Sequence, residues 1–499
     1  MRRVFAIGII FLVAFALQAQ TTLQTARSGD PASGVSSVTL ITLADFGMGN
    51  GQRPNSPLIQ GLDGNFYDTT YQGGAWRNGT VFNMTPAGIV TTLYSFCPEN
   101  NCNAGNHAQA GMTLFSDGNY YGTNTTLGTG NGGTFFQVTP QGVFTVLYNF
   151  CSLPSCADGS APDGPLTVGS DGYLYGTTVS GGANNEGTVF KITPQGVLTT
   201  LHSFALSEGA SPESLVLATD GNFYGTAFSG GSGAFCVPAN NCGTVFKMTP
   251  QGVLTKLYDF CQLASCTDGF YPFGFIQAAD GNFYGTTLLG GANTKGQGYG
   301  TAFKITSKGS FTTLYSFCSM ANCADGYTPV GMIQANDGNL YGTTGAGGAT
   351  TNAGTVFELT VKGALTTLYD FCTGGGTNCP DGAYPLRLLQ GTDGSFYGVT
   401  YYGGPKSSNY GTAFKLTTGL GKSVKTVTTS GKVGASVIIL GTTLTGASKV
   451  TFNGVSAAFT VVSSSEITAT VPAGAKTGAV VVTTPSASLK SNKNFQVTK

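Results

Sequence analysis

The sequence predicts an all-β protein: a seven-bladed β-propeller of four-stranded blades, followed by an immunoglobulin-like β-sandwich. Three short phrases recur in a fixed order along most of the 499 residues. Glycine is abundant, with 76 residues, and only 9% of residues are charged while 41% are hydrophobic. This composition is typical of many short strands joined by glycine-rich turns around a large apolar core.

The recurring phrases define the repeat. The first, Asp-Gly-x-(aromatic or Leu)-Tyr, begins at Asp63, Asp117, Asp171, Asp220, Asp280, Asp337 and Asp393. The second, Gly-Thr-x-Phe, begins at Gly79, Gly133, Gly187, Gly243, Gly300, Gly354 and Gly411. The third, typified by Thr-Thr-Leu-Tyr-Ser-Phe, ends at Phe96, Phe150, Phe204, Phe260, Phe317 and Phe371. A period of about 50 to 60 residues is that of propeller blades.

Each unit reads as four antiparallel strands. In the unit around Asp280 we expect strands at residues 275–278, 282–287, 301–306 and 310–317, with a tight turn at Asp280-Gly281. The seventh unit stops at residue 417 without the third phrase, which occurs instead at residues 41–46. An N-terminal outer strand that completes the last blade explains this offset, whereas an open solenoid would show capping repeats at both ends.

The N-terminus has the pattern of a secretory signal peptide over residues 1–20. Arg2 and Arg3 precede an apolar run at residues 4–17, and Ala19 suits cleavage. The run is short for a membrane span, so an uncleaved anchor is the weaker alternative. The expected domains are a flexible spacer at 21–36, the propeller at 37–421 and the sandwich at 422–499. We expect a secreted, monomeric protein with no transmembrane segment after cleavage.

The twelve cysteines agree with export. Closely spaced, even-numbered cysteines in an exported chain predict disulfides, with a shared zinc site as the weaker alternative. The loop after Phe204 lacks both cysteines rather than one, which supports pairing within each loop. The predicted pairs are Cys97 with Cys102, Cys151 with Cys156, Cys236 with Cys242, Cys261 with Cys266, Cys318 with Cys323, and Cys372 with Cys379.

The predicted strand order places the long loops on one face. The loops that join the second strand to the third open with Gly-Gly, and the loops that join one unit to the next carry most of the cysteines. Both kinds emerge on the same side of a propeller, while the other two turns are short. Function on a rigid scaffold usually sits in its longer loops, so this face is the expected working face.

The repeat phrases together resemble the GloVer tandem repeat of bacterial exported proteins, over residues 37–417. The resemblance implies an extracellular protein without an established activity. The family often carries a C-terminal sorting anchor, but the last residues of this sequence show no apolar segment with a basic tail. Instead, Ser430-Gly431-Lys432-Val433-Gly434, Val450-Thr451-Phe452-Asn453-Gly454 and Val471-Pro472-Ala473-Gly474 resemble an IPT/TIG domain. Such immunoglobulin-like modules are usually accessory or adhesive.

Constellations of catalytic residues are scarce. The chain has two histidines: His202 occupies a slot that is tyrosine in other repeats, and His107 lies in a cysteine loop without an evident partner. A Ser-His-Asp apparatus is therefore not expected. No phosphate-binding glycine loop, metalloprotease helix motif or EF-hand loop is present, and nothing indicates nucleic-acid binding.

Carboxylates recur just before the first strand of several units. These are Asp158, Asp268, Asp325 and Asp381, with Glu208 in the matching slot of the cysteine-free loop. Sevenfold geometry would place them around the channel mouth, where they could hold Ca²⁺ or a polyhydroxylated ligand. The alternative is that each Asp-Gly forms a turn, in which the carboxylate accepts hydrogen bonds from backbone N–H groups. We expect no obligatory cofactor.

Aromatic residues accompany these loops and suit sugar stacking or protein contact, although packing of loop against loop is the alternative. The ones retained as candidate ligand-binding residues, besides the four aspartates, are Trp76, Phe270, Tyr271, Tyr327 and Tyr384. Residues from Lys422 onward include eight lysines and one acid, Glu466, a net of +7, which leaves −7 on residues 1–421 of the neutral chain.

These observations predict a non-catalytic extracellular or cell-surface binding scaffold. A glycan or an envelope protein is the expected ligand, on the cysteine-loop face. The alternative is a secreted polysaccharide hydrolase or lyase that uses the channel-mouth carboxylates, which requires two acids within reach of one sugar bond.

Overall fold

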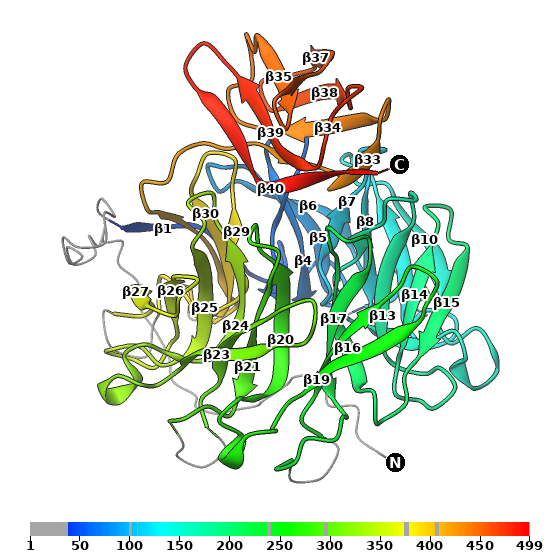
Figure 1. Cartoon of the computed structure of the whole chain (residues 1–499), viewed down its shortest axis with the longest axis vertical. Helices are drawn as coiled ribbons and strands as arrows, with labels where there is room; N and C mark the ends of the chain where they lie inside the picture. The colour runs from blue at the N-terminus through cyan, green and yellow to red at the C-terminus, as the bar shows by residue number, and fades with distance from the viewer. Residues whose placement is uncertain are drawn as a thin grey trace.

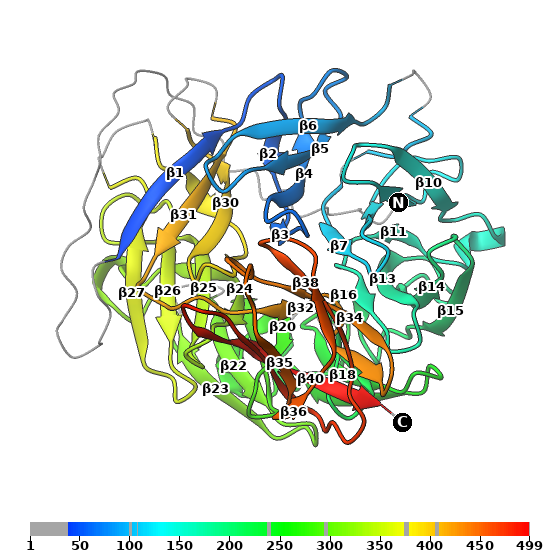
Figure 2. The same cartoon turned by 90° about the horizontal axis from the view of Figure 1, so that it is seen from above.

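The computed structural model describes residues 38–98, 102–106, 108–236, 241–293, 298–373, 379–404 and 409–498. The predicted signal peptide, the spacer and His107 lie outside these residues. The described chain is all-β, with forty strands and three short 3-10 turns. Seven antiparallel sheets follow one another around a central axis, and two further sheets of the tail lie across one side of this ring (Figures 1 and 2).

Each of the first three sheets contains the residues of one repeat. The first holds β2 (Gln52–Pro54), β3 (Ile59–Gln60), β4 (Phe66–Gln72), β5 (Thr80–Met84) and β6 (Val90–Ser95). The second holds β7 (Met112–Leu114), β8 (Tyr120–Asn124), β9 (Thr134–Val138) and β10 (Phe144–Asn149). The third holds β11 (Ser160–Pro162), β12 (Thr167–Val168), β13 (Leu174–Ser180), β14 (Thr188–Ile192) and β15 (Leu198–Ser203).

The next three sheets are regular four-stranded meanders. The fourth holds β16 (Ala210–Leu217), β17 (Phe223–Ser229), β18 (Thr244–Met248) and β19 (Leu254–Asp259). The fifth holds β20 (Phe270–Gln277), β21 (Phe283–Leu289), β22 (Thr301–Ile305) and β23 (Phe311–Ser316). The sixth holds β24 (Tyr327–Gln334), β25 (Leu340–Ala346), β26 (Thr355–Leu359) and β27 (Leu365–Asp370).

The seventh sheet joins the two ends of the repeat region. Its strands are β28 (Ala383–Pro385), β29 (Leu389–Gln390), β30 (Phe396–Tyr402), β31 (Thr412–Thr417) and the N-terminal β1 (Thr39–Asp45). β1 pairs antiparallel with β31, from Thr39 opposite Thr417 to Asp45 opposite Thr412. This register confirms that the N-terminal strand completes the seventh sheet.

The first strand of the fifth sheet begins earlier than the sequence predicts, at Phe270 rather than near residue 275. Pro272 and Gly274 within it argue against a strand in sequence-based reasoning. The register shifts between Phe273 and Phe275, so a bulge accommodates both residues while pairing continues with β21. The other three strands of this unit lie within about one or two residues of their predicted bounds.

Apolar side chains pack between successive sheets rather than within one. Tyr67 and Phe96 of the first sheet share a cluster with Met112 and Phe136 of the second. A corresponding cluster joins the seventh sheet to the first, where Phe66 packs with Tyr397 at 4.1 Å between ring centroids. Each sheet is thus stabilised by both neighbours, the last and the first included.

A glycine–proline contact repeats at these junctions. A Cβ placed on Gly300 would meet the carbonyl oxygen of Thr287 and would lie 2.7 Å from Cδ of Pro329 in the next sheet. Glycine is therefore required here for close approach as well as for its φ of +93°. The same approach brings Gly411 of the seventh sheet to Pro54 of the first.

The tail forms two sheets around one core. One consists of β32 (Lys425–Thr426), β34 (Ser436–Leu440), β37 (Phe459–Val461) and β38 (Glu466–Thr470). The other consists of β33 (Ser430–Lys432), β35 (Lys449–Phe452), β36 (Val455–Ser456), β39 (Gly478–Thr483) and β40 (Ser488–Thr498). Both contribute to a single cluster that includes Ile439, Ile467, Val480 and Phe495.

The tail rests on the short turns of the ring. Ser465 donates a hydrogen bond to the Leu62 carbonyl at 2.6 Å, and Gln496 donates to the Thr219 carbonyl at 3.1 Å. These turns belong to the first and fourth sheets, which lie far apart around the ring. The tail therefore spans the side opposite the cysteine loops (Figure 1).

The glycine–proline contact can be tested with a matched pair of substitutions. We expect Gly300→Ala to lower the free energy of unfolding by about 3 kcal/mol, because it adds a clash to the strain of a positive φ. Gly281→Ala has a similar φ of +80° but no atom within 4 Å of the added Cβ, so about 1 kcal/mol is expected. Denaturant unfolding of both variants checks this, and equal losses would show that the contact adds nothing.

Candidate functional site

All six predicted disulfides are present. The confirmed bonds join Cys97 with Cys102, Cys151 with Cys156, Cys236 with Cys242, Cys261 with Cys266, Cys318 with Cys323, and Cys372 with Cys379. Cys102, Cys236 and Cys379 each adjoin residues outside the described ranges, and each is nevertheless bonded to its predicted partner. No free cysteine remains among the described residues, so the shared zinc site has no ligands to offer and that alternative is wrong.

One bond differs from the others in its place in the repeat. Cys236 and Cys242 lie in the Gly-Gly loop between β17 and β18, whereas the other five bonds lie in loops that join one sheet to the next. The Cys242 carbonyl accepts a hydrogen bond from the Tyr271 N–H at 3.0 Å. The disulfide therefore lies in a loop of the fourth sheet that is hydrogen-bonded to the first strand of the fifth.

The cysteine loops and the Gly-Gly loops form one continuous face. In the sixth sheet the backbone N–H of Gly348 donates to the carbonyl of Cys323 at 2.9 Å, and in the fifth Gly291 donates to Cys266 at 3.0 Å. In the seventh, Gly404 donates to the carbonyl of Cys379 at 2.8 Å. The two loop types therefore support each other, which confirms that they emerge on the same side.

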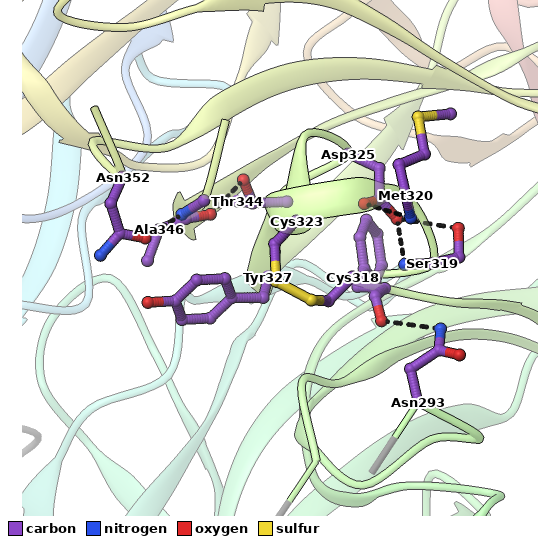
Figure 3. The surroundings of a disulfide bond; sticks show 12 residues. Asn293, Cys318, Ser319, Met320, Cys323, Asp325, Tyr327, Thr344, Ala346 and Asn352 are labelled. Atoms are coloured by element: carbon purple, nitrogen blue, oxygen red, sulfur yellow. Dashed lines mark hydrogen bonds between the residues drawn. A yellow bond between two sulfur atoms is a disulfide. The ribbon is translucent and has the colours of Figure 1, made fainter. Parts of the chain in front are cut away.

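Within a cysteine loop the recurring aspartate holds the backbone. Figure 3 shows the loop closed by Cys318 and Cys323, where Asp325 accepts hydrogen bonds from the N–H groups of Ser319 at 2.8 Å and Met320 at 3.1 Å. It also accepts from the Tyr315 hydroxyl at 2.8 Å. Asp325 has no exposed surface. Its carboxylate is fully engaged in shaping the loop that contains η3 (Ala321–Cys323).

The other three predicted aspartates have equivalent partners. Asp158 accepts from Tyr148, Ser152 and Leu153, in the loop that contains η1 (Pro154–Cys156). Asp268 accepts from Tyr258, Gln262 and Leu263, next to η2 (Ala264–Cys266). Asp381 accepts from the Tyr369 hydroxyl and the Cys372 N–H. The turn-capping alternative therefore describes their geometry, in place of an open ring of acids at a channel mouth.

The pKa of each capping carboxyl depends on the balance between desolvation and hydrogen bonding. Burial disfavours the ionised form of Asp158, but the hydrogen bonds from Tyr148, Ser152 and Leu153 outweigh it and lower the pKa of this carboxyl. At Asp381 desolvation outweighs the hydrogen bonds from Tyr369 and Cys372, and the pKa of this carboxyl is raised.

The cysteine-free loop preserves the cap with different residues. Glu208 accepts from the Ala205 N–H at 3.0 Å and lies 3.1 Å from Nε2 of His202. The longer acid and the imidazole thus replace the aspartate and the tyrosine of the other loops. Asn50 plays a similar part after β1, where its side-chain oxygen accepts from the Gly47 N–H at 2.8 Å. His202 is a structural variant, as the sequence predicts.

Most of the predicted aromatic residues pack against other rings. Tyr271 stacks on Phe228 at 4.6 Å between centroids and also contacts Phe270 at 5.0 Å. Tyr327 contacts Tyr299 at 5.3 Å. These rings hold loop to loop.

Trp76 is different, because 53% of its surface is exposed on the loop between β4 and β5. Phe235, on the loop between β17 and β18, is 49% exposed. Both side chains are exposed on this face.

A tyrosine cluster lies at the seam between the seventh and first sheets. The Arg53 guanidinium lies 5.6 Å from the ring centroids of both Tyr401 and Tyr402. Tyr384 contacts Tyr401 at 6.3 Å and Tyr402 at 6.5 Å. We call these four residues the seam cluster. Tyr384 is a predicted candidate, whereas Arg53 and Tyr401 are not, because only closure of the ring brings residues 53 and 401 together.

Three charged residues missed by the sequence analysis face the axis of the ring. Glu213 belongs to β16, Asp163 lies between β11 and β12, and Arg387 lies between β28 and β29. The Arg387 guanidinium lies over the ring of Phe273 in the fifth sheet, 4.4 Å from its centroid, and its Nε donates to the Val330 carbonyl in the sixth. Such contacts among several sheets occur only near the axis. We call Asp163, Glu213 and Arg387 the axial cluster.

The axial carboxyls are strongly perturbed. Burial raises the pKa of Asp163 to about 6 and that of Glu213 to about 8, although the positive charge of Arg387 opposes both shifts. No ion pair among the described residues includes Arg387, so it acts on both acids from beyond contact distance. A sequence signal was available, because Asp163 and Glu213 directly follow the proline that recurs in the first strand of most repeats.

Asp68 is a second perturbed carboxyl. In the other six repeats the residue that follows the tyrosine of Asp-Gly-x-(aromatic or Leu)-Tyr is glycine, as at Gly122, but in the first repeat it is Asp68. The side chain has no exposed surface and accepts a hydrogen bond from the Ser56 hydroxyl, while its Oδ2 has no partner among the described residues. Burial raises the pKa of Asp68 to about 8, against the hydrogen bonds from Ser56 and Thr69.

No group of three or more His, Cys, Asp or Glu side chains in the described ranges could hold a metal ion. In the same ranges, no helix is long and apolar enough to cross a membrane.

Removal of a capping aspartate should destabilise its own loop. Asp325→Ala would leave two buried N–H groups and a tyrosine hydroxyl without their acceptor, which should lower the free energy of unfolding by about 2 kcal/mol. Hydrogen exchange should accelerate in residues 318–326 of this variant and stay unchanged in the equivalent loop of the fifth sheet. Unchanged exchange in both loops would contradict the capping role.

Asp68 predicts an unusual pH dependence. The unfolded carboxyl titrates near 4, so the raised folded pKa costs stability progressively as the pH rises from about 4 to 8, and fully above that. Asp68→Asn should therefore raise the free energy of unfolding by about 1–3 kcal/mol at pH 8.5 and change it little at pH 4. Denaturant unfolding at the two pH values checks this, and an equal effect at both would contradict the ionisation argument.

Comparison with known proteins gives two family matches. A model described as the Gloeobacter/Verrucomicrobia repeat matches residues 30–162, 151–330 and 238–459. The IPT/TIG domain model matches residues 422–497. Comparison with curated protein sequences found no match.

Solved structures show similarity of fold. A streptogramin B lyase is 14% identical, with a TM-score of 0.50, over 76% of this chain and 97% of the lyase. A fungal alcohol oxidase of the AA5 family, solved with copper, is 12% identical, with a TM-score of 0.51, over 92% of this chain and 98% of the oxidase. At these identities the likeness concerns the fold alone. Because the repeat model matches well over half of the chain, the protein belongs to the Gloeobacter/Verrucomicrobia repeat family, and it carries a C-terminal IPT/TIG domain.

Proposed function

We propose that the protein is a non-catalytic extracellular binding scaffold that recognises a glycan on its cysteine-loop face. In this proposal the seven sheets are the blades of a seven-bladed propeller, and the tail is an immunoglobulin-like accessory domain. The six disulfides fit an oxidising extracellular compartment. The net charge of +7 on the tail would favour retention of the monomer at an anionic cell envelope.

The seam cluster is the observation that carries the proposal. Tyr384, Tyr401 and Tyr402 offer rings and hydroxyls whose positions are fixed by mutual contact and by Arg53. Tyrosine rings lose little conformational freedom on binding, and they combine an apolar face with a polar edge. Tyr402 is partly exposed. Sugar rings present alternating C–H and O–H groups, which such a surface accommodates.

The alternative of a polysaccharide hydrolase or lyase receives less support. It required two free acids at the channel mouth, but Asp158, Asp268, Asp325 and Asp381 are each occupied by local N–H and hydroxyl donors. We propose further that glycan binding needs no cofactor, Ca²⁺ included.

A glycan array with the mature protein tests this function. Wild type should bind a subset of glycans, and Tyr402→Ala should weaken binding about fivefold or more, the equivalent of about 1 kcal/mol per lost ring contact. Phe235→Ala, which removes an exposed ring of the fourth sheet on the same face, is the matched control and should bind as wild type. Chelation with EDTA should change nothing. Absence of binding to every glycan would overturn the proposal, and capture of an envelope protein weakened by Tyr402→Ala would replace the glycan with a protein partner.

A further inference from the structure

The axial cluster contains charges of both signs that do not neutralise each other by contact. Asp163 and Glu213 come from adjacent sheets, the third and fourth, while Arg387 reaches the axis from the seventh. Arg387 influences both acids electrostatically, yet among the described residues it forms no ion pair with either. Oppositely charged groups that act on one another from beyond contact distance can each be engaged by a ligand that carries both charges.

Glu213 provides an independent sign of a missing partner. Its side chain is only 8% exposed, and its Oε2 is fully buried without a hydrogen-bond partner among the described residues. A buried carboxylate oxygen without a donor costs about 1–3 kcal/mol, so such atoms are rare in folded proteins. An ammonium group between Glu213 and Asp163 would supply donors to both carboxylates.

Arg387 provides the complementary half. Its stem crosses Gly331 of the sixth sheet, where an added Cβ would lie 3.3 Å from Nε, and its guanidinium stacks on Phe273. Its hydrogen bond to the Val330 carbonyl uses Nε, which leaves the donors of the terminal nitrogens for a carboxylate. Arg387 and Asp163 both remain partly accessible, in contrast to the fully buried residues of the sheet cores.

We propose that the axial cluster is a binding site for a small zwitterion of the α-amino acid class, with its carboxylate on Arg387 and its ammonium between Asp163 and Glu213. The formal charge of the three residues is −1, which disfavours a purely anionic ligand such as a sugar acid. A simple amine would leave Arg387 unpaired, and a simple carboxylate would leave both acids unpaired. Only a ligand with both charges satisfies all three residues. This site is separate from the seam cluster and does not depend on the glycan proposal.

The glycine-sized positions near Arg387 limit the ligand further. Gly274 and Gly331 have no side chains, which leaves room for Arg387 to lie against their backbone. Phe273 and Val330 lie beside Arg387 in the same region. The side chain of the amino acid would therefore meet an apolar surface. We expect a preference for small or apolar amino acids over charged ones.

Isothermal titration of the mature protein with individual L-amino acids tests this proposal. Alanine, valine and leucine are the first probes, with methylamine, acetate and galacturonate as single-charge controls. We expect binding of at least one amino acid and none of the controls. Glu213→Gln and Arg387→Met should each weaken binding about tenfold or more, as expected when one partner of an enclosed charge pair is lost. Glu186→Gln removes a carboxylate from the loop between β13 and β14 and should bind as wild type.

A proton count gives a second readout. An ammonium requires Glu213 in its ionised form, and the pKa of this carboxyl is raised to about 8. Binding at pH 7 should therefore release protons, measured as a dependence of the binding heat on the ionisation enthalpy of the buffer, and Glu213→Gln should abolish most of the release.

The outcomes separate the two sites. Tyr402→Ala should leave amino acid binding unchanged, so failure of the glycan proposal would not affect this one. Failure of every amino acid to bind the folded wild type, equal binding of methylamine or acetate, or unaltered affinity in both axial variants would each overturn the proposal. Circular dichroism and unfolding midpoints confirm that each variant is folded before it is titrated.

Discussion

The structure depends on the close approach of each sheet to the next, which is made possible by a glycine and, at most junctions, a proline. The glycine of Gly-Thr-x-Phe has a positive φ and receives the proline of the following sheet, as Gly300 receives Pro329 and Gly411 receives Pro54. The residue before that proline also has a left-handed backbone, and its N–H donates across the junction, as from Arg53 to the Tyr410 carbonyl at 2.8 Å. Because the seventh junction uses the same contacts, the last sheet packs on the first in the same way as neighbouring sheets do at the other proline-containing junctions.

This constraint separates the fixed parts of the repeat from the variable ones. The glycine cannot gain a side chain without a clash. The residue that follows the proline position faces the axis instead, and close packing between sheets does not restrict its side chain in this way. At that position the first five repeats carry Asn55, Gln109, Asp163, Glu213 and Phe273 in turn. The scaffold thus tolerates diversity at the axis, where its seven sheets come together. The axial carboxyls lie there and not in the cysteine loops, whose aspartates are needed to hold the loops themselves.

The sequence predicts the scaffold better than the site, for a physical reason. Turn phrases, cysteine pairs and the displaced outer strand are local or periodic signals, and the disulfides and the pairing of β1 with β31 confirm them. The axial cluster draws one residue each from the third, fourth and seventh repeats, so no fixed spacing in the sequence indicates it. Departures from the repeat could have indicated it, since Asp163 and Glu213 occupy a slot that is Phe273 and Val330 elsewhere. The aspartates of the loops were conspicuous because they recur, and recurrence here reflects their structural role.

The position of the tail domain bears on how a ligand reaches the axis. Its contacts with Leu62, Thr219 and Gln334 belong to three sheets around the ring, so it lies across the side of the short turns. Lys425, beside the axis on that side, donates to the Gln390 carbonyl, and burial lowers its pKa to about 7. β11, which ends just before Asp163, and β16, which contains Glu213, both begin at the cysteine-loop face, only a few residues before these acids. A ligand of the axial cluster would therefore enter from the cysteine-loop face, the same face on which the seam cluster lies.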